Sequence, residues 1–208
     1  MGRELSSGTW RVFCAIDLPE PVRALVGQHI SELRRAVPDA RASWSRPESI
    51  HLTLKFHGQV PVAGVAKLSS AVARAVEGMP PFRLGIGGTG AFPSHGSPRV
   101  LWIGVHDSSG RLAELHERLE DESAGVGFER EARSFHPHLT IARLRRQDRR
   151  MGRGDDTQQA RFLTAAHKEA LFPPVEITVS ELLVIRSELG NAGSKYTTIS
   201  RHLMSDKL

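Results

Sequence analysis

The chain has 208 residues, of which 39% are hydrophobic and 25% charged, as in a globular protein with a core of its own. It has no apolar run of about 18 residues, which excludes a membrane-spanning helix, and its first ten residues lack the apolar segment of a secretory signal. The single cysteine, Cys14, excludes an internal disulfide and lies in an apolar segment. We therefore expect a buried thiol and a cytoplasmic protein.

The net charge of +5 is concentrated in one segment. Six arginines and one aspartate lie between residues 143 and 153, so this segment alone accounts for the whole excess. Guanidinium groups pair well with phosphate, and the cluster therefore indicates a polyanionic partner. An ordinary solvated loop is the alternative interpretation.

Segments typical of strands and helices alternate along the chain. We expect strands over residues 11–17, 50–56, 82–88, 99–105, 137–143, 175–187 and 196–202. We expect helices over residues 19–37, 61–77, 108–123 and 157–168. A turn-rich stretch at residues 190–193 joins the last two predicted strands. The pattern predicts an α+β fold.

Two parts of the chain repeat the same order of features. In each, a strand that begins with Arg-Val is followed by a helix and then by a strand with the motif His-x-Thr. Arg11 precedes His51 by 40 residues, and Arg99 precedes His138 by 39. Agreement of order, type and spacing indicates a duplicated unit.

We interpret residues 1–208 as one domain with an internal repeat over roughly residues 10–57 and 98–144. The repeat predicts two pseudo-symmetric lobes, each with an antiparallel sheet packed against helices. The two motifs are then expected to face each other across a cleft between the lobes.

Each motif places an imidazole beside a hydroxyl. Side chains two residues apart in a strand point to the same face, so His51 lies beside Thr53, and His138 beside Thr140. Two histidines on opposite sides of a phosphate can act as base and acid in the in-line cleavage of a phosphodiester. The threonine hydroxyls can bind the non-bridging oxygens, and Arg143 can add a charge-assisted contact.

Two other kinds of site are weaker interpretations. His57, His136 and His138 are near one another in sequence, but Pro137 and the lack of a carboxylate in register disfavour a metal site. We expect no metal and no cofactor, with His57 and His136 at the cleft edge or surface. Residues 85–90 match a dinucleotide-binding glycine pattern, but the prolines that follow exclude the helix this site needs, so we expect a loop or strand edge.

The chain resembles the two-histidine phosphoesterase superfamily, and most of all its RNA 2′,3′-cyclic phosphodiesterase branch, also called the 2′-5′ RNA ligase or LigT-like family. The matching segments are RVFCAIDLP, HLTLKFHG, RVLWIGV, FHPHLTIAR and LLVIRSELGNAGSKYTTI. The resemblance implies a bilobal fold, metal-independent hydrolysis of RNA 2′,3′-cyclic phosphate ends to 2′-phosphates, and a weak, reversible 2′-5′ ligation. His57 departs from the family pattern, which usually has an apolar residue there.

By this resemblance, His51 and His138 are catalytic, and Thr53, Thr140 and Arg143 bind the substrate phosphate. We take His138 as the better candidate for the base and His51 for the acid, although the repeat makes the roles interchangeable. The implied partner is RNA with a 2′,3′-cyclic phosphate end, tRNA fragments among them, bound by a monomer. The candidate RNA-binding residues are Arg145, Arg146, Arg149 and Arg150.

Three questions remain open from the sequence. Phe13 and Phe56 are candidates for stacking on a terminal base, although core positions are the simpler interpretation. A non-catalytic RNA-binding module is an alternative function. A phosphodiesterase that acts on a small cyclic nucleotide or an ADP-ribose cyclic phosphate is another.

Overall fold

The computed structural model describes residues 8–94, 96–144, 155–190 and 193–205. The strands are β1 (Thr9–Asp17), β2 (Ala42–Trp44), β3 (His51–Pro61), β4 (Phe82–Phe92), β5 (Val100–His106), β6 (His138–Leu144), β7 (Val175–Val179), β8 (Glu181–Gly190) and β9 (Gly193–Leu203). The helices are α1 (Glu20–Ala36), α2 (Val65–Val76), α3 (Arg111–Gly125) and α4 (Asp155–Glu169), with short 3-10 helices η1 (Pro47–Ser49) and η2 (Val62–Gly64). The short strand β2 and both 3-10 helices were not among the predicted elements.

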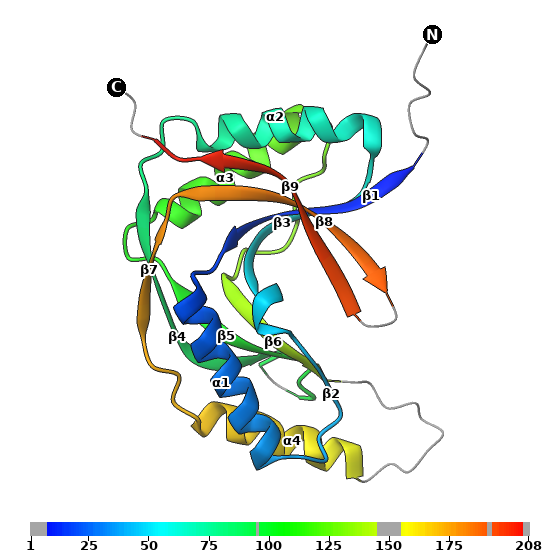
Figure 1. Cartoon of the computed structure of the whole chain (residues 1–208), viewed down its shortest axis with the longest axis vertical. Helices are drawn as coiled ribbons and strands as arrows, with labels where there is room; N and C mark the ends of the chain where they lie inside the picture. The colour runs from blue at the N-terminus through cyan, green and yellow to red at the C-terminus, as the bar shows by residue number, and fades with distance from the viewer. Residues whose placement is uncertain (1–7, 95, 145–154, 191–192, 206–208) are drawn as a thin grey trace.

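The strands form two antiparallel sheets. The first sheet has the order β3-β1-β8-β9, and the second has the order β2-β6-β5-β4-β7. Figure 1 shows α2 and α3 above the first sheet, and α1 and α4 on the side of the second. The predicted α+β fold with two sheets and covering helices is confirmed.

Helices α1 and α3 each pack on the side of the sheet that does not contain the strand before them. Helix α1 follows β1 of the first sheet, yet it contacts α4, which packs on β4 of the second sheet. Helix α3 follows β5 of the second sheet, yet it contacts α2 and β3 of the first. Helices α1 and α3 thus each pack with the sheet that does not contain the strand before them, and β2, which follows α1, pairs with β6 of the second sheet, so neither lobe is a continuous stretch of sequence.

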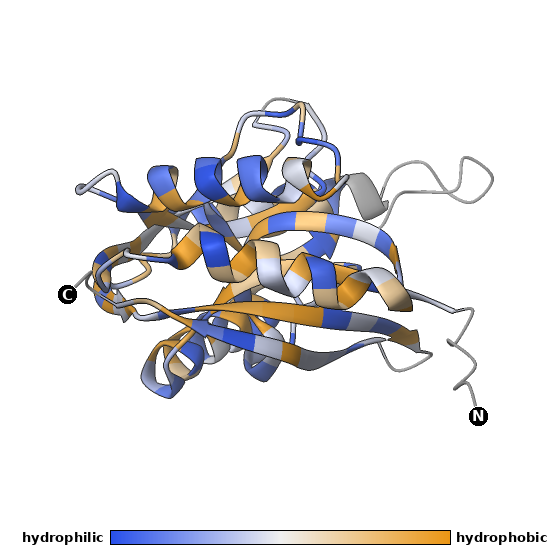
Figure 2. Cartoon of the chain, turned by 90° about the horizontal axis from the view of Figure 1, so that it is seen from above, coloured by the Kyte–Doolittle hydropathy of each residue, from blue (hydrophilic) through white to orange (hydrophobic). Residues whose placement is uncertain are grey.

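The core is formed from both sheets. One cluster of buried side chains contains Val12 and Leu52 from the first sheet and Leu84 and Ile103 from the second. Cys14 belongs to the same cluster and is fully buried, as predicted, and burial raises the pKa of its thiol to about 12. Figure 2 shows hydrophilic and hydrophobic residues mixed along the helices, as expected where one helix face packs on a sheet.

The predicted strand over residues 175–187 is wrong in one respect, because two strands occupy it. Strand β7 pairs with β4 in the second sheet, and β8 pairs with β1 and β9 in the first. Ser180 is the single residue between them. The link contains no glycine or proline, so the sequence has no turn signal there. Only the burial pattern changes, from alternating in β7 to continuous over 182–185 in β8.

The glycine-rich residues 85–90 are in a strand and not in a loop, and only residues 85 and 86 of them pair with β7, so the rest lie where β4 has no described neighbour on that side. On the other side of β4, Thr89 and Gly90 pair with Ile103 and Trp102 of β5. A Cβ on Gly90 would lie 2.1 Å from Trp102 of β5. The absence of a side chain at Gly90 therefore lets the indole of Trp102 lie across β4.

Two buried histidines connect α1 and α4 to the second sheet. His29 Nε2 lies 3.0 Å from His167 Nδ1, and His167 Nε2 lies 3.0 Å from the Trp102 carbonyl oxygen. A carbonyl can only accept, so His167 Nε2 carries a proton and donates it, and Nδ1 accepts from His29. Burial lowers the pKa of His167 to about 4, so both rings are neutral in the folded protein at neutral pH.

Candidate active site

The two motif strands lie next to each other. Strands β3 and β6 contact one another, one from each sheet. The loop after β2 joins them: Ser45 Oγ donates to the Thr140 carbonyl at 2.8 Å, and the Ser45 amide donates to the Ile141 carbonyl at 2.9 Å. The chain then runs through η1 directly to His51. The structure thus brings the two predicted motifs into one region.

The side chains in each motif alternate as predicted. Leu52 and Leu139 are buried, whereas the histidine before each and the threonine after each are half-buried. In each strand one face therefore packs into the core, and the other presents an imidazole beside a hydroxyl. The structure places Thr53 and Thr140 where the sequence predicts them.

His51 is held by one hydrogen bond and two rings. Its Nδ1 donates to the Ser49 carbonyl at 2.9 Å. The ring stacks on Phe13 at a centroid distance of 4.7 Å, and Tyr196 meets its edge at 5.1 Å. Burial lowers the pKa of His51, and the Ser49 carbonyl and the Asp17 carboxylate oppose this shift.

His138 has the matching arrangement. Its Nδ1 donates to the His136 carbonyl at 2.6 Å, and Phe92 meets its ring at 5.0 Å in a T-shaped contact. Burial lowers the pKa of His138, the bond to the His136 carbonyl raises it, and the charge of Arg143 lowers it further. The two histidines thus differ in their charged neighbour, a carboxylate for His51 and a guanidinium for His138.

The same tautomer is fixed at both motifs. In each, the carbonyl two residues earlier can only accept, so Nδ1 carries the proton. The Nε2 atom of each neutral ring is then left with a lone pair for a proton from a substrate or water. Two such groups on neighbouring strands have the chemistry needed for general acid and base catalysis.

A bulge follows the threonine in each motif strand. One lies where β3 passes from Thr53 to Lys55, and another where β6 passes from Thr140 to Ala142. An extra residue reverses the alternation. Phe56 and Arg143, each five residues after its histidine, are both exposed. Phe56 contacts the ring of Phe13, which in turn stacks on His51. Phe56 is therefore not a core residue, whereas Phe13, at 1% exposure, is.

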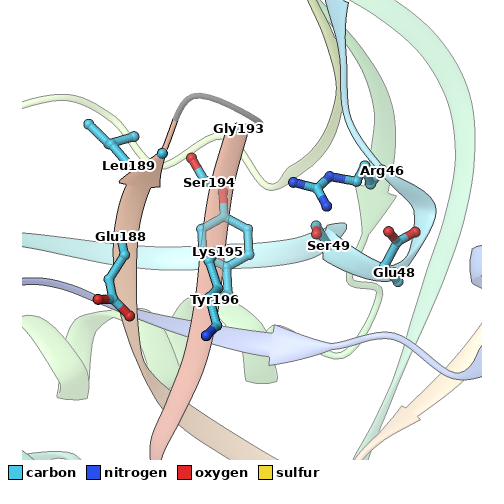
Figure 3. A pocket seen from close by; sticks show the side chains of 10 residues that line it. Arg46, Glu48, Ser49, Glu188, Leu189, Gly193, Ser194, Lys195 and Tyr196 are labelled. Atoms are coloured by element: carbon cyan, nitrogen blue, oxygen red, sulfur yellow. The ribbon is translucent and has the colours of Figure 1, made fainter.

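A groove of about 780 Å³ opens beside His51. It lies between η1 and the β8–β9 hairpin, and its lining includes Arg46, Ser49, Ser194 and Tyr196. Figure 3 shows Arg46 pointing toward the start of β9. Ser49 and Tyr196 line this groove and also contact His51, so the groove adjoins the surroundings of His51.

His57 is not at the cleft edge. Its Nε2 lies 3.4 Å from the buried Cys14 Sγ, and its ring meets Phe128 at 5.1 Å. Burial and the charge of Lys55 lower the pKa of His57 to about 4. The bulges in β3 turn His57 toward the core side, so strand alternation counted from His51 predicts its direction wrongly. His136 is exposed, as predicted.

Several other expectations concern the surroundings of the site. Arg145, Arg146, Arg149 and Arg150 lie outside the described residues. Within the part of the chain that the structure describes, no group of three or more His, Cys, Asp or Glu residues is arranged to hold a metal ion. No described helix is long and apolar enough to cross a membrane.

Sequence reasoning missed three residues around His51. Ser49 and Asp17 were not singled out, because a backbone carbonyl has no sequence signal and Asp17 simply ends an apolar strand. Tyr196 lies 145 residues after His51, and only its place in the segment LLVIRSELGNAGSKYTTI pointed to it.

Comparison with known families agrees with this geometry. The model of the 2′-5′ RNA ligase superfamily matches residues 21–191. The chain belongs to this superfamily. Its relatives include two proteins named RNA 2′,3′-cyclic phosphodiesterase. The one from Thermotoga maritima is 31% identical over 189 residues, 91% of this chain and 92% of the relative. The one from Methanothermobacter thermautotrophicus is 32% identical over 187 residues, 90% of this chain and 95% of the relative.

Solved structures of the superfamily share the fold. TT0787 of Thermus thermophilus has a TM-score of 0.74 and 26% identity, over 95% of this chain and 100% of that one. E. coli LigT complexed with 3′-AMP has a TM-score of 0.69 and 25% identity, over 95% and 99% of the two chains. The family predicted from the sequence motifs is therefore confirmed.

Proposed function

We propose that this member of the superfamily is an RNA 2′,3′-cyclic phosphodiesterase that uses His51 and His138 as its catalytic pair. The observation that carries the proposal is the matched pair of imidazoles, each fixed through Nδ1 by a carbonyl and each beside a threonine on adjacent strands. The names of the curated relatives support the reaction.

In the proposed reaction, water attacks the phosphorus of the cyclic phosphate. The base accepts a proton from the water, the bond from phosphorus to O3′ breaks, and the acid protonates O3′, which leaves a 2′-phosphate and a free 3′-hydroxyl. Thr53, Thr140 and Arg143 bind the non-bridging oxygens, where negative charge increases in the transition state.

The charged neighbours favour one assignment of the two roles. The Asp17 carboxylate favours the protonated form of His51, which suits the acid. The Arg143 guanidinium favours the neutral form of His138, which suits the base. We therefore assign protonation of O3′ to His51 and activation of water to His138.

The remaining parts of the site fit an RNA end. The exposed ring of Phe56 offers a stacking surface for a base, and the groove beside His51 has room for a nucleoside next to the phosphate. E. coli LigT, with the same fold, has been solved with 3′-AMP. The arginines at 145, 146, 149 and 150 are proposed to contact the RNA backbone, so binding of oligonucleotides should weaken steeply with salt.

The same site also allows ligation in principle. If a ribose 5′-hydroxyl reaches the phosphorus in place of water, the same proton transfers join two RNA ends through a 2′-5′ linkage. Hydrolysis is favoured in dilute RNA, because water is always present at the site.

The direct test is turnover of adenosine 2′,3′-cyclic phosphate in the presence of EDTA, with the product identified by chromatography against 2′-AMP and 3′-AMP standards. We expect 2′-AMP, and we expect His51→Ala and His138→Ala each to reduce kcat by about 10²–10⁴-fold, the usual contribution of general acid–base catalysis. His106→Ala, which alters an exposed histidine at the end of β5, is the matched control and should keep full activity.

Two results would reject the proposal in different ways. RNA binding without turnover at any pH would favour a non-catalytic RNA-binding module. Turnover of an ADP-ribose cyclic phosphate with none of an RNA substrate would favour a small-molecule phosphodiesterase.

A further inference from the structure

A buried ion pair lies behind the first motif. Lys55 is two residues after Thr53 in β3, and its Nζ lies 2.7 Å from Glu120 Oε2 in α3. The side chains are only 2% and 3% exposed. Burial raises the pKa of Glu120, but hydrogen bonds from Lys55 and the Glu131 amide more than offset this, so its pKa stays below the usual range. The Glu120 carboxyl is thus ionised inside the core.

The pair also binds the backbone of the connecting segment, residues 126–137, which joins α3 to β6. Lys55 Nζ donates to the Glu129 carbonyl at 2.8 Å. The Glu131 amide donates to Glu120 Oε2 at 3.0 Å. The connecting segment has neither helix nor strand over residues 128–137, so these bonds take the place of a regular hydrogen-bond ladder.

A second contact from α3 holds the same segment nearer to the second motif. The His116 ring stacks on Phe135, with the centroids 4.1 Å apart and the planes at 8°. Phe135 directly precedes His136, and the carbonyl of His136 accepts the bond from His138 Nδ1. The connecting segment is thus held at Glu129, Glu131 and Phe135. The next residue after Phe135 provides the carbonyl that orients His138.

A buried ion pair is a poor source of stability, because removing two charges from water costs about as much as their attraction returns. An apolar pair of similar volume would pack at this position, but it would leave the Glu129 carbonyl and the Glu131 amide without partners. The contribution of the two charged side chains is therefore to hold the backbone of the connecting segment in one position.

We propose that Lys55 and Glu120 are positioning residues that fix the connecting segment so that the His136 carbonyl orients His138. This rests on the proposed function only in that His138 is taken to be catalytic. Strand β3 then has two roles. His51 and Thr53 face the substrate, whereas the buried Lys55 holds the second motif in place.

The test replaces the pair by apolar residues of similar size, in the double variant Lys55→Met with Glu120→Leu. We expect kcat to fall by about 10–100-fold, as for a catalytic group displaced by a fraction of an ångström to an ångström, while KM changes less than about threefold. The matched control is Arg74→Met with Glu122→Leu, which removes an ion pair between α2 and α3 that is partly exposed. We expect that control to keep kcat.

A second measurement does not depend on activity. NMR titration of the ligand-free protein reports the pKa and the tautomer of each histidine. In the Lys55→Met, Glu120→Leu variant, we expect the His138 ring to lose its single tautomer and its pKa to fall further, because the His136 carbonyl that raises this pKa moves away. His51, held by Ser49, should be unchanged and serves as the internal reference.

The outcomes separate the two proposals. A His138 signal unchanged from the wild type in a folded double variant overturns the positioning role, whatever the activity. If the His138 signal changes in the double variant and the wild-type protein hydrolyses no cyclic phosphate, the positioning role is supported and the proposed function is rejected. If the double variant does not fold, His116→Ala tests the same segment through Phe135, and an unchanged His138 signal and kcat there overturn the proposal.

Discussion

Acid should destabilise this protein through the buried pair of His29 and His167. The His167 pKa is lowered to about 4, whereas an unfolded histidine has a pKa of 6.5, and the His29 pKa is shifted in the same direction. Because the folded pKa is the lower one, the unfolded chain binds more protons below pH 6.5. The contribution of His167 to stability is therefore complete above about pH 6.5 and is lost as the pH falls toward 4.

The size of this effect follows from the His167 pKa. A difference between 6.5 and about 4 is worth about 3 kcal/mol in full, and about 2 kcal/mol of that should be lost between pH 7 and pH 5. His167 is fully buried, so solvent screening reduces this little. Urea unfolding followed by circular dichroism at a series of pH values measures the loss directly.

The variant His167→Gln separates this pair from other acid-sensitive groups. Its amide can still donate to the Trp102 carbonyl and accept from His29, but it cannot bind a proton in this range. We expect the variant to be less sensitive to acid than the wild type by about 2 kcal/mol between pH 7 and pH 5. His106→Gln, an exposed control, should keep the wild-type slope. Equal slopes for wild type and His167→Gln would refute the reasoning.

Three further predictions follow from the site and its support. In Asp17→Asn, loss of the carboxylate lowers the pKa of His51, so the alkaline limb of the kcat profile should move to lower pH; movement of the acidic limb instead would reverse the assigned roles. Phe56→Ala should raise KM for the cyclic nucleotide by about tenfold through lost stacking, and calorimetry should show little change in Tm because the ring is 56% exposed. Gly90→Ala should lower the free energy of unfolding in urea by about 1–3 kcal/mol, because its Cβ would overlap the Trp102 ring; an unchanged midpoint would contradict this packing.

The sequence predicts the motif strands well because they combine a repeat with strict alternation. In β3 and β6 the apolar residues after each histidine pack in the core, so the imidazole and hydroxyl must face the other way. The alternation fails at the bulges, where neighbouring strands, not the local sequence, decide which residue is extra. Counting by twos from His51 would put Lys55 beside Thr53, yet Lys55 is buried against Glu120.

The long-range features could not be predicted for a different reason. The exchange of α1 and α3 between lobes depends on which sheet each helix covers, and both sheets offer an apolar face. The carbonyls that fix the two tautomers belong to Ser49 and His136, whose backbone positions depend on η1 and the connecting segment. A pattern of side chains has no information on such backbone partners.

Ser180 has a mechanical consequence for the enzyme. This one residue carries the chain from the second sheet to the first, and its carbonyl accepts a hydrogen bond from the Met204 amide at the end of β9. Because the connection is one residue long and helices α1 and α3 pack across the two lobes, we expect little motion of one sheet relative to the other. The separation of His51 and His138 is then set when the chain folds. An RNA end has to fit that separation without a closing motion of the two sheets.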